Sequence, residues 1–274
     1  MMKEIFTPGR TELAGNHTDH QKGRILASAV DLGLYAKYAP NDEGVVRVHS
    51  LGYEPFEVKI SQLAVRPAEF GSPKSLVRGM VNAFSELGLQ VGGFDAQLRS
   101  TLAAGSGLSS SAAFSVMIGR ILSALYNDGK VDPVVIARAA QAAENKYFGK
   151  PCGLMDQLAC SLGHTVYVDF KTNEIVPLTA DFEAMGLTLC LTDTGGSHAG
   201  WTAPTRASRR TWCMWPISST RACSATSTRP NSAPRAGIRP TAPCAARCTS
   251  STRTSACRKC ATRCSRATAR STCV

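Results

Sequence analysis

The stretch LAAGSGLSSSAAFSVMIGRILSAL, residues 102–125, predicts a strand end, a loop of glycine and serine, and a long helix in immediate succession. Gly105 and Gly107 allow the backbone to turn tightly and to approach a ligand closely. The helix begins near Ser110, and the free N–H groups of its first turn favour an anion. Its expected core face consists of Phe114, Met117, Ile118, Ile121 and Leu125. The stretch therefore indicates an anion-binding loop between a strand and a helix.

Two well-known nucleotide-binding loops are excluded by the residues of this stretch. No Gly-Lys-Ser/Thr triplet follows the glycines, so the loop is not a Walker A motif, and the glycines lack the spacing of the dinucleotide fingerprint. A serine-capped helix that follows a flexible turn and binds nothing is the structural alternative. Composition alone does not separate this alternative from an anion-binding loop.

Hydrophobic periodicity predicts strands and helices in mixed order on both sides of this stretch. Strands are expected over residues 25–39, 45–50, 93–102, 165–170 and 187–194, and helices over residues 72–88 and 132–149. The polar turn at 40–44 is expected to join the first two strands as a hairpin, and Gly88 to end the first of these helices. The second helix has Asp132 at its N-cap and Pro133 at its first position. This order predicts an α+β domain.

A polar run near the N-terminus, GRTELAGNHTDHQKGR at residues 9–24, is a candidate binding site. His17 and His20 have the spacing of a helical metal pair. Asn16-His17-Thr18 matches a glycosylation sequon by chance, because the chain reads as cytosolic. Clustered Asn, His and Asp side chains also suit a neutral sugar, whose hydroxyl groups both donate and accept hydrogen bonds.

Charge and cysteine content divide the chain near residue 200. Residues 201–274 hold 13 Arg and 1 Lys with no Asp or Glu, whereas residues 1–200 hold 17 basic and 20 acidic residues. Three of the 11 Cys lie in the first part, which suits a reducing cytoplasm. The N-terminal MMKEIF lacks the apolar core of a signal peptide, and no run approaches transmembrane length. We therefore expect a cytoplasmic protein that binds neither nucleic acid nor membrane.

The segment after residue 199 does not have the composition of a folded domain. Residues 201–274 contain no Leu, Phe or Tyr, and 24 of them are Ser or Thr. The spacing of Cys257, Cys260 and Cys264 fits no known zinc finger, and no His is available. This composition is typical of GC-rich DNA translated out of frame, and a shifted reading of residues 211–219 encodes a mainly apolar run. We therefore expect a domain over residues 1–199 and an out-of-frame, unstructured tail over residues 200–274.

Four blocks of sequence resemble the GHMP small-molecule kinases. GSGLSSSAA resembles their phosphate-binding loop, and PGRTELAGNHTDHQKG resembles the signature of the galactokinases within this family. AENKYFGKPCGLMDQ (143–157) is similar to the galactokinase segment that carries a catalytic Asp, and DTGGSH (193–198) to the strand and turn that follow. The resemblance implies the α+β fold of the GHMP-kinase N-terminal domain, which is ribosomal protein S5 domain 2-like, with the family's C-terminal lobe missing after Ala199.

The resemblance also implies a role for each matching residue. Asp156 is the expected catalytic carboxylate, and Arg10 is expected beside it and beside the transferring phosphoryl group. Ser111 and Glu144 are the expected ligands of Mg²⁺, which prefers hard oxygen donors. The expected sugar-binding residues are Asn16, His17, Thr18, Asp19 and Gly153, and the expected ATP-binding residues are Gly105, Ser106, Gly107, Leu108, Ser109, Ser110 and Ser111.

The implied activity is the ATP-dependent phosphorylation of galactose at its C1 hydroxyl, with ATP as co-substrate and Mg²⁺ as cofactor, in a protein that we expect to be monomeric. Asn16 stands where the galactokinase pattern has Glu, so a kinase for a related sugar is an alternative. A non-catalytic sugar sensor on the same fold is another, against which the intact Ser111-Ala112 pair counts. Because the tail lacks the motifs of the second lobe, we expect the chain as written to be defective.

A tail that arises from a frame error should be removed readily by proteases, because it has no Leu, Phe or Tyr with which to build a core and its 14 positive charges repel one another. Limited proteolysis of the purified chain should leave a fragment that ends near residue 199, and resequencing around codon 200 should reveal a missing or extra base. A protease-resistant full-length product with kinase activity would contradict this prediction.

Overall fold

The computed structural model describes residues 2–15, 18–102 and 106–190 of the 274-residue chain. The strands are β1 (Lys3–Ala14), β2 (Arg24–Asn41), β3 (Val45–Ser50), β4 (Phe56–Lys59), β5 (Gly93–Ser100), β6 (Thr165–Asp169) and β7 (Glu174–Leu178). The α-helices are α1 (Pro73–Glu86), α2 (Ser110–Tyr126), α3 (Pro133–Ala143) and α4 (Met155–Leu162). Short 3-10 turns occupy Asp19–Gln21 and Pro67–Glu69, and a π-helical turn occupies Glu144–Phe148. The described residues thus form the α+β arrangement that the sequence predicts.

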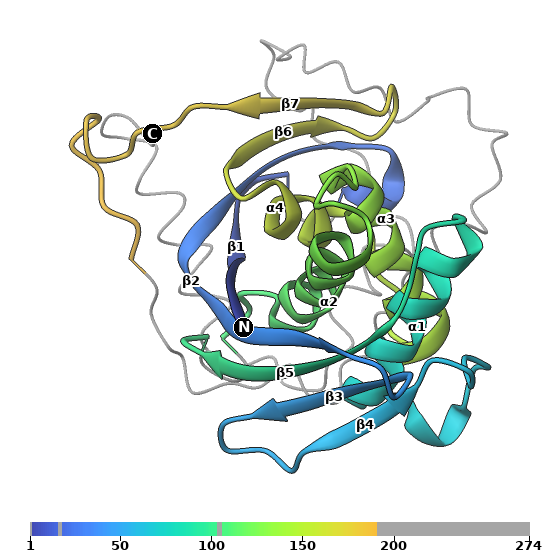
Figure 1. The fold of residues 1–274 in the computed structure, drawn as a ribbon. Coiled ribbons are helices and arrows are strands. Elements are labelled where there is room, and N and C mark those ends of the chain that lie inside the picture. The colour runs from blue at the N-terminus through green and yellow to red at the C-terminus, as the bar shows by residue number, and fades with distance from the viewer. Residues whose placement is uncertain (1, 16–17, 103–105, 191–274) are drawn as a thin grey trace, which may run out of the picture. The chain divides into compact units, whose positions relative to one another are not determined.

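The long strand β2 is the centre of the sheet. The strands lie in the order β4-β3-β5-β2-β6-β7, and β1 pairs with β2. β1 is antiparallel to β2 from Lys3↔Tyr38 to Ala14↔Leu26, while β5 pairs with residues 34–41 of β2 and β6 with residues 24–27. Figure 1 shows the sheet curving around the helices, with β6 and β7 at one end and β3 and β4 at the other.

The expected hairpin between residues 25–39 and 45–50 is wrong. β2 and β3 follow one another in the chain, but β5 lies between them, antiparallel to β2 and parallel to β3. Phe94, Ala96 and Leu98 of β5 are buried, as predicted, and a strand with such an apolar inner face is most stable with neighbours on both sides and helices over it. The turn at 40–44 therefore carries the chain across the position that β5 occupies in the sheet. The second neighbour of β3 is β4.

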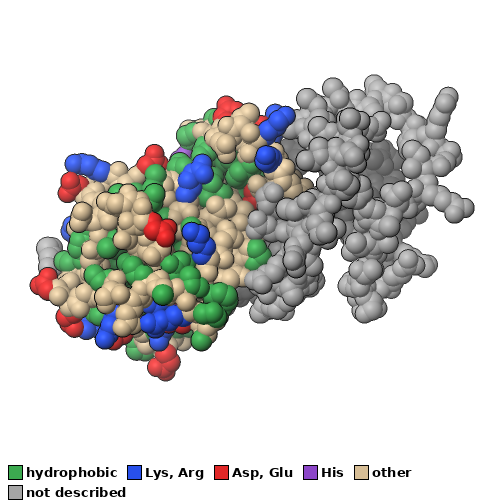
Figure 2. Space-filling view, turned by 90° about the vertical axis from the view of Figure 1, so that its right-hand side faces the viewer, with side chains coloured by type: hydrophobic (Ala, Val, Ile, Leu, Met, Phe, Trp, Pro, Cys, Tyr) green, Lys and Arg blue, Asp and Glu red, His purple; other side chains and the backbone are tan. Residues whose placement is uncertain are grey.

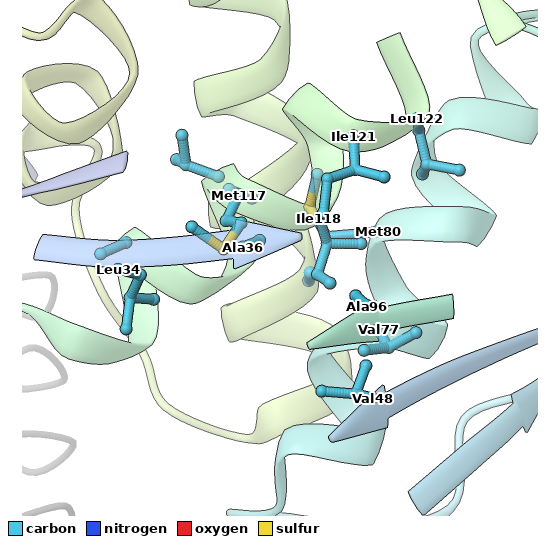
Figure 3. Close-up of a cluster of buried hydrophobic side chains, with 14 of the residues drawn as sticks. Leu34, Ala36, Val48, Val77, Met80, Ala96, Met117, Ile118, Ile121 and Leu122 are labelled. Atoms are coloured by element: carbon cyan, nitrogen blue, oxygen red, sulfur yellow. The ribbon is translucent and has the colours of Figure 1, made fainter. Parts of the chain in front are cut away.

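The main core lies between the helices and the inner faces of β2, β3 and β5. Figure 3 shows Met117, Ile118, Ile121 and Leu122 of α2 and Val77 and Met80 of α1 meeting Leu34, Ala36, Val48 and Ala96 of the strands. The predicted apolar face of α2 is confirmed at its centre, whereas Phe114 and Leu125 are only partly buried. In α1 the central apolar side chains are buried and Leu87, after its last turn, is exposed. Each large aliphatic side chain that is fully buried stabilises the fold by about 1.5–3 kcal/mol.

A second, smaller cluster holds the short helix α4. Leu158 and Ala159 of α4 belong to it, together with Ile25 of β2, Ala137 of α3 and Val166 of β6. An isolated helix of eight residues is not stable in water, so α4 depends on this packing. The position of its first turn, which contains Asp156, is therefore set by the cluster rather than by helix propensity.

The helix expected over residues 132–149 is present in two parts. Asp132 accepts a hydrogen bond from Val134 N at 2.7 Å, and Pro133 occupies the first turn, as predicted. The α-helical pattern ends at Ala143, and a π-helical turn then runs to Phe148. Gly149 closes that turn with a φ of 77°. Turns of this width occur frequently at functional sites.

Other elements differ from the expectation near the ends of the domain. β1, β4, β7 and α4 are present although periodicity did not single them out. The strand expected over residues 187–194 is not formed in its described half, where residues 187–190 have no strand partner and Leu187 and Leu189 are exposed. Residues 191–194, the DTGGSH block and the tail lie outside the described residues.

Acidic and basic side chains are interspersed on the face of the domain drawn in Figure 2, as the near balance of charge in residues 1–200 predicts. Among the helices that the structure describes, none is both long enough and apolar enough to cross a bilayer.

Gly79 offers a test of the packing between α1 and α3. A Cβ at this position would lie 2.7 Å from the Ala143 Cβ and 2.8 Å from its Cα, so the two helices would have to separate. Gly79→Ala should lower the free energy of unfolding by about 1–3 kcal/mol. Helix propensity alone would change it by up to about 1 kcal/mol in the opposite direction.

Urea unfolding of the purified chain measures this effect. Ser85→Ala, at an exposed position of the same helix, is the matched control and should change stability by less than about 0.5 kcal/mol. A Gly79→Ala variant as stable as the parent would show that the helices do not meet as described.

Candidate functional site

Arg10 joins three elements of the domain at one point. It lies at an irregularity of β1, where the pairing with β2 changes from Pro8↔Gly33 to Arg10↔Ala29. Its Nε and Nη2 lie 2.9 Å and 2.8 Å from Asp156 Oδ1, and its Nη1 donates to the Gly107 carbonyl at 2.8 Å. The predicted pair of Arg10 and Asp156 is therefore brought together from positions 146 residues apart, beside the glycine loop.

Asp156 is held as a carboxylate by its surroundings. Burial alone would raise its pKa, but the positive charges of Arg10 and Lys150 and hydrogen bonds from Ser109 and Arg10 outweigh burial, so the pKa lies below its usual range. The side chain is 16% exposed, which leaves one side open to a ligand. An ionised, partly accessible carboxylate can accept a proton from a hydroxyl group placed against it.

The glycine loop rests directly on β1. Arg10 N donates to the Leu108 carbonyl at 3.2 Å, and Leu108 is buried. A Cβ at Gly9 would lie 2.9 Å from the Leu108 carbonyl oxygen and 2.8 Å from Leu102 Cδ2, so only glycine allows this approach. Backbone contacts therefore hold the loop, at Leu108, at a fixed distance from β1.

Ser109 connects the loop to the carboxylate. It stands at the N-cap of α2 in the left-handed region, with φ 59° and ψ 50°, and its side chain does not cap the helix. It instead hydrogen-bonds Asp156. The first N–H groups of α2 have no partners within the helix and carry its positive dipole end, which suits a phosphate group.

Glu144, Ser111 and Lys150 form a second polar group beside this one. Glu144 is fully buried in the first position of the π-helical turn, and neither carboxylate oxygen has a hydrogen-bond partner. Lys150 Nζ lies 3.4 Å from Glu144 Oε2 and 3.4 Å from Ser111 Oγ. Burial by itself lowers the pKa of Lys150, but Glu144 and Asp156 raise it further than burial lowers it.

These residues fit a magnesium ion in their donor chemistry. Mg²⁺ takes few protein ligands, usually a carboxylate with substrate phosphates and waters, and a buried carboxylate without hydrogen bonds needs a cation. Among the described residues no group of three or more His, Cys, Asp or Glu is placed to hold a metal. A metal here would therefore depend on Glu144, Ser111 and the ligand itself.

Of the predicted sugar-binding residues, the structure describes Thr18, Asp19 and Gly153. Asp19 is packed against Gly153, where a Cβ would lie 1.7 Å from Asp19 Oδ2, so any larger residue at 153 would displace the carboxylate. Thr18 Oγ1 donates to the Arg24 carbonyl at 2.8 Å and so helps to close its own loop. Asn16 and His17 lie outside the described residues.

The segment that carries Gly153 is held by reciprocal hydrogen bonds. Cys152 N donates to Asn145 Oδ1 at 2.8 Å, and Asn145 Nδ2 donates to the Cys152 carbonyl at 3.3 Å. Burial raises the pKa of the Cys152 thiol, which is free and therefore stays protonated near neutral pH. Asn145 thus fixes the loop that brings Gly153 to Asp19.

The predicted site residues of the described part form three groups of contacts. Arg10, Gly107, Ser109 and Asp156 contact one another, Ser111 and Glu144 meet through Lys150, and Asp19 meets Gly153. Ser106 and Ser110 are exposed, and Gly105 lies outside the described residues. Lys150 was missed by the sequence reasoning. The sequence shows only that Lys150 lies midway between Glu144 and Asp156. No regular spacing indicates that the three side chains meet.

Two family models match parts of this chain. Residues 75–164 match the family described as the GHMP kinases N terminal domain, and residues 4–40 match the galactokinase galactose-binding signature. A galactokinase of Streptomyces coelicolor is 34% identical over 197 residues, which cover 70% of this chain and 50% of that protein. A galactokinase of Bacillus subtilis is 32% identical over 164 residues, covering 59% and 42% of the two chains.

Solved structures share the fold. A Lactococcus lactis galactokinase crystallised with galactose superposes with a TM-score of 0.63 at 22% identity, covering 79% of this chain and 58% of that one. The Methanococcus jannaschii mevalonate kinase superposes with a TM-score of 0.56 at 19% identity, covering 67% and 58%. The chain spans about half the length of the curated relatives it matches. Two segments of the chain thus match the N-terminal domain of the GHMP kinases and the galactose-binding signature of the galactokinases.

Proposed function

We propose that this domain serves the phosphorylation of galactose by ATP at the C1 hydroxyl. The observation that carries the proposal is the contact of Arg10 with both Asp156 and the Gly107 carbonyl, which places an ionised carboxylate directly beside the glycine loop. Proton acceptance and phosphate binding are the two tasks that transfer of a phosphoryl group to a sugar hydroxyl requires. The proposal includes a cytoplasmic location and a domain boundary near residue 199.

Asp156 accepts the proton of the attacking hydroxyl. The hydroxyl oxygen forms a bond to the terminal phosphorus of ATP, the bond from that phosphorus to the bridging oxygen breaks, and the proton passes to a carboxylate oxygen of Asp156 while ADP leaves. The lowered pKa keeps the carboxylate ionised at neutral pH, so the rate falls only when acid protonates it. Arg10 holds the carboxylate in place and offsets negative charge on the phosphoryl group.

The glycine loop and the start of α2 bind the nucleotide phosphates. Leu108 anchors the loop in the core, and the N–H groups at the start of α2 are available to phosphate oxygens. Glu144 and Ser111 would hold Mg²⁺, which supplies charge neutralisation of the phosphates when bound. Ser111 lies on α2 and Glu144 on the π-helical turn, and Lys150 contacts both, so the fold brings the two residues together without a ligand.

The sugar hydroxyls are bound by Asp19 and by the loop at residues 16–18, against the backbone of Gly153. The contact of Asp19 with Gly153 supports this assignment, because it places a carboxylate next to a half-buried glycine. Asn16, in place of the Glu of the family pattern, favours a related sugar as the second candidate substrate. A neutral amide both donates and accepts, whereas a carboxylate only accepts, so the exchange would alter which hydroxyl is preferred.

A panel of hexoses tests the proposed substrate. The enzyme with the reading frame restored after residue 199 should convert ATP and galactose to ADP and galactose 1-phosphate, which a coupled assay for ADP and phosphorus NMR of the product would detect. Turnover of glucose or mannose without turnover of galactose would contradict the assignment. Turnover of a sugar that differs from galactose at one hydroxyl would support the second candidate.

Asp156→Asn tests the proton acceptor. In the same enzyme this variant should lower kcat by about two to four orders of magnitude, the range expected for loss of a general base, with little change in the KM for galactose. Asp169→Asn is the matched control, because Asp169 is also a shielded carboxylate bound by an arginine, Arg24 at 2.7 Å. The control should retain kcat, and a near-normal kcat in Asp156→Asn would contradict the assigned role.

A further inference from the structure

Lys150 is a partly exposed cation, with 36% of its side chain accessible, that the family resemblance does not account for. It follows the π-helical turn, and its backbone N donates to the Glu144 carbonyl at 3.1 Å, which folds the chain back over the start of that turn. Gly149, at a φ of 77°, allows the fold-back. The ammonium is therefore brought to Glu144 and Ser111 by the path of the backbone and not by a chance extension of a long side chain.

The ion pair of Lys150 with Glu144 is loose. Both contacts recorded for the ammonium, to Glu144 Oε2 and to Ser111 Oγ, are 3.4 Å long, beyond the 2.7–3.2 Å of a normal N–H···O hydrogen bond. Glu144 is fully buried and neither of its oxygens accepts a hydrogen bond. A buried carboxylate without hydrogen bonds is costly, so this arrangement favours a further cation at Glu144, while the partly exposed ammonium remains open to another acceptor.

Arg10 and Lys150 differ in their capacity to bind such a ligand. Arg10 uses Nε, Nη1 and Nη2 at normal lengths on Asp156 and the Gly107 carbonyl. Lys150 has three N–H donors and no contact shorter than 3.4 Å among the described residues. Of these two cations beside Asp156, Lys150 is the one that can turn toward a new acceptor without breaking a short hydrogen bond.

The ammonium and the helix end beside it, rather than the net charge of the site, favour an anion as that acceptor. Arg10 and Lys150 balance Asp156 and Glu144, so the polar group is formally neutral before any ligand binds. Ser111 lies in the first turn of α2, so the ammonium stands at the positive end of that helix. Lysine is a point charge that binds phosphate without a fixed geometry.

We propose that Lys150 is a phosphate-binding residue, whose ammonium leaves Glu144 for the phosphate oxygens of ATP and thereby frees the carboxylate for Mg²⁺. The inference rests on the proposed function, because the phosphates are those of its co-substrate. In the absence of a metal, Lys150 itself is the cation that offsets the phosphate charge. Nucleotide binding by this chain is then only weakly dependent on Mg²⁺.

Binding of metal-free ATP tests the inference. Isothermal titration calorimetry of the full chain with ATP in EDTA measures the dissociation constant without activity as the readout. Lys150→Met should weaken metal-free ATP by about tenfold or more, the cost of losing a hydrogen bond to a charged group. Lys150→Arg should retain most of the affinity. Lys146→Met removes an exposed lysine of the same turn and should change nothing.

Substitutions of Glu144 separate phosphate binding from a purely structural role. Glu144→Gln should strengthen metal-free ATP binding, because the ammonium is no longer shared with a carboxylate, and should remove the added effect of Mg²⁺. If Lys150→Met alone does not fold because it leaves Glu144 buried without a cation, the double variant Lys150→Met, Glu144→Gln avoids that charge. It should bind metal-free ATP about tenfold or more weakly than Glu144→Gln alone.

The possible failures are distinguishable. Equal affinity of Lys150→Met and the parent for metal-free ATP, or equal affinity of the double variant and Glu144→Gln, would overturn the role of Lys150 while leaving the proposed function in place. A parent chain that binds no ATP either with or without Mg²⁺ would contradict the proposed function itself.

Discussion

The ion pair between Arg10 and Asp156 is the contact on which the arrangement of the site depends. It joins the strand at the N-terminal end of the chain to a short helix 146 residues later, and the same guanidinium holds the glycine loop through the Gly107 carbonyl. Each partner is fixed by a different part of the fold, since β1 is paired along β2 and α4 is packed in the second cluster. Without the arginine, Asp156 would keep the burial that raises its pKa and lose the nearest charge that lowers it.

The sequence predicted those elements that are determined by residues close to one another in the chain. The glycine–serine loop with the helix after it, the end of α1 at Gly88 and the cap of α3 at Asp132 each follow from residues a few positions apart. The partner of β3 was not predictable in this way, because the place of β5 is set by where its apolar face finds helices to cover it. Helix α4 escaped notice for a related reason, as it is too short to form without the strands that it packs on.

In the candidate site, too, some features could be predicted from the sequence and others could not. The sequence predicts four of the site residues, Arg10, Ser111, Glu144 and Asp156, because they lie in blocks that resemble a family. Residue type and order along the chain were enough for that prediction. What the sequence could not indicate was the environment of each one. A glutamate on a predicted helix is ordinarily solvated, yet Glu144 is fully buried, because the helix widens into a π turn at that residue and the chain folds back over it. The contact with Lys150 results from that fold-back.

Gly9 has a consequence for how such a domain can change its substrate. The loop lies on β1 through contacts between main-chain atoms, with no side-chain torsion between the strand and the Leu108 carbonyl. The separation between the loop and the carboxylate on α4 is therefore a property of the scaffold, as stiff as a paired strand. The residues that we propose to bind the acceptor, Asp19 and Gly153, lie on other segments and contact each other. Mutations of those residues can change which acceptor binds while the distance between the glycine loop and the Asp156 carboxylate stays the same. The domain can therefore gain a new acceptor specificity without a change in the proposed nucleotide-binding loop.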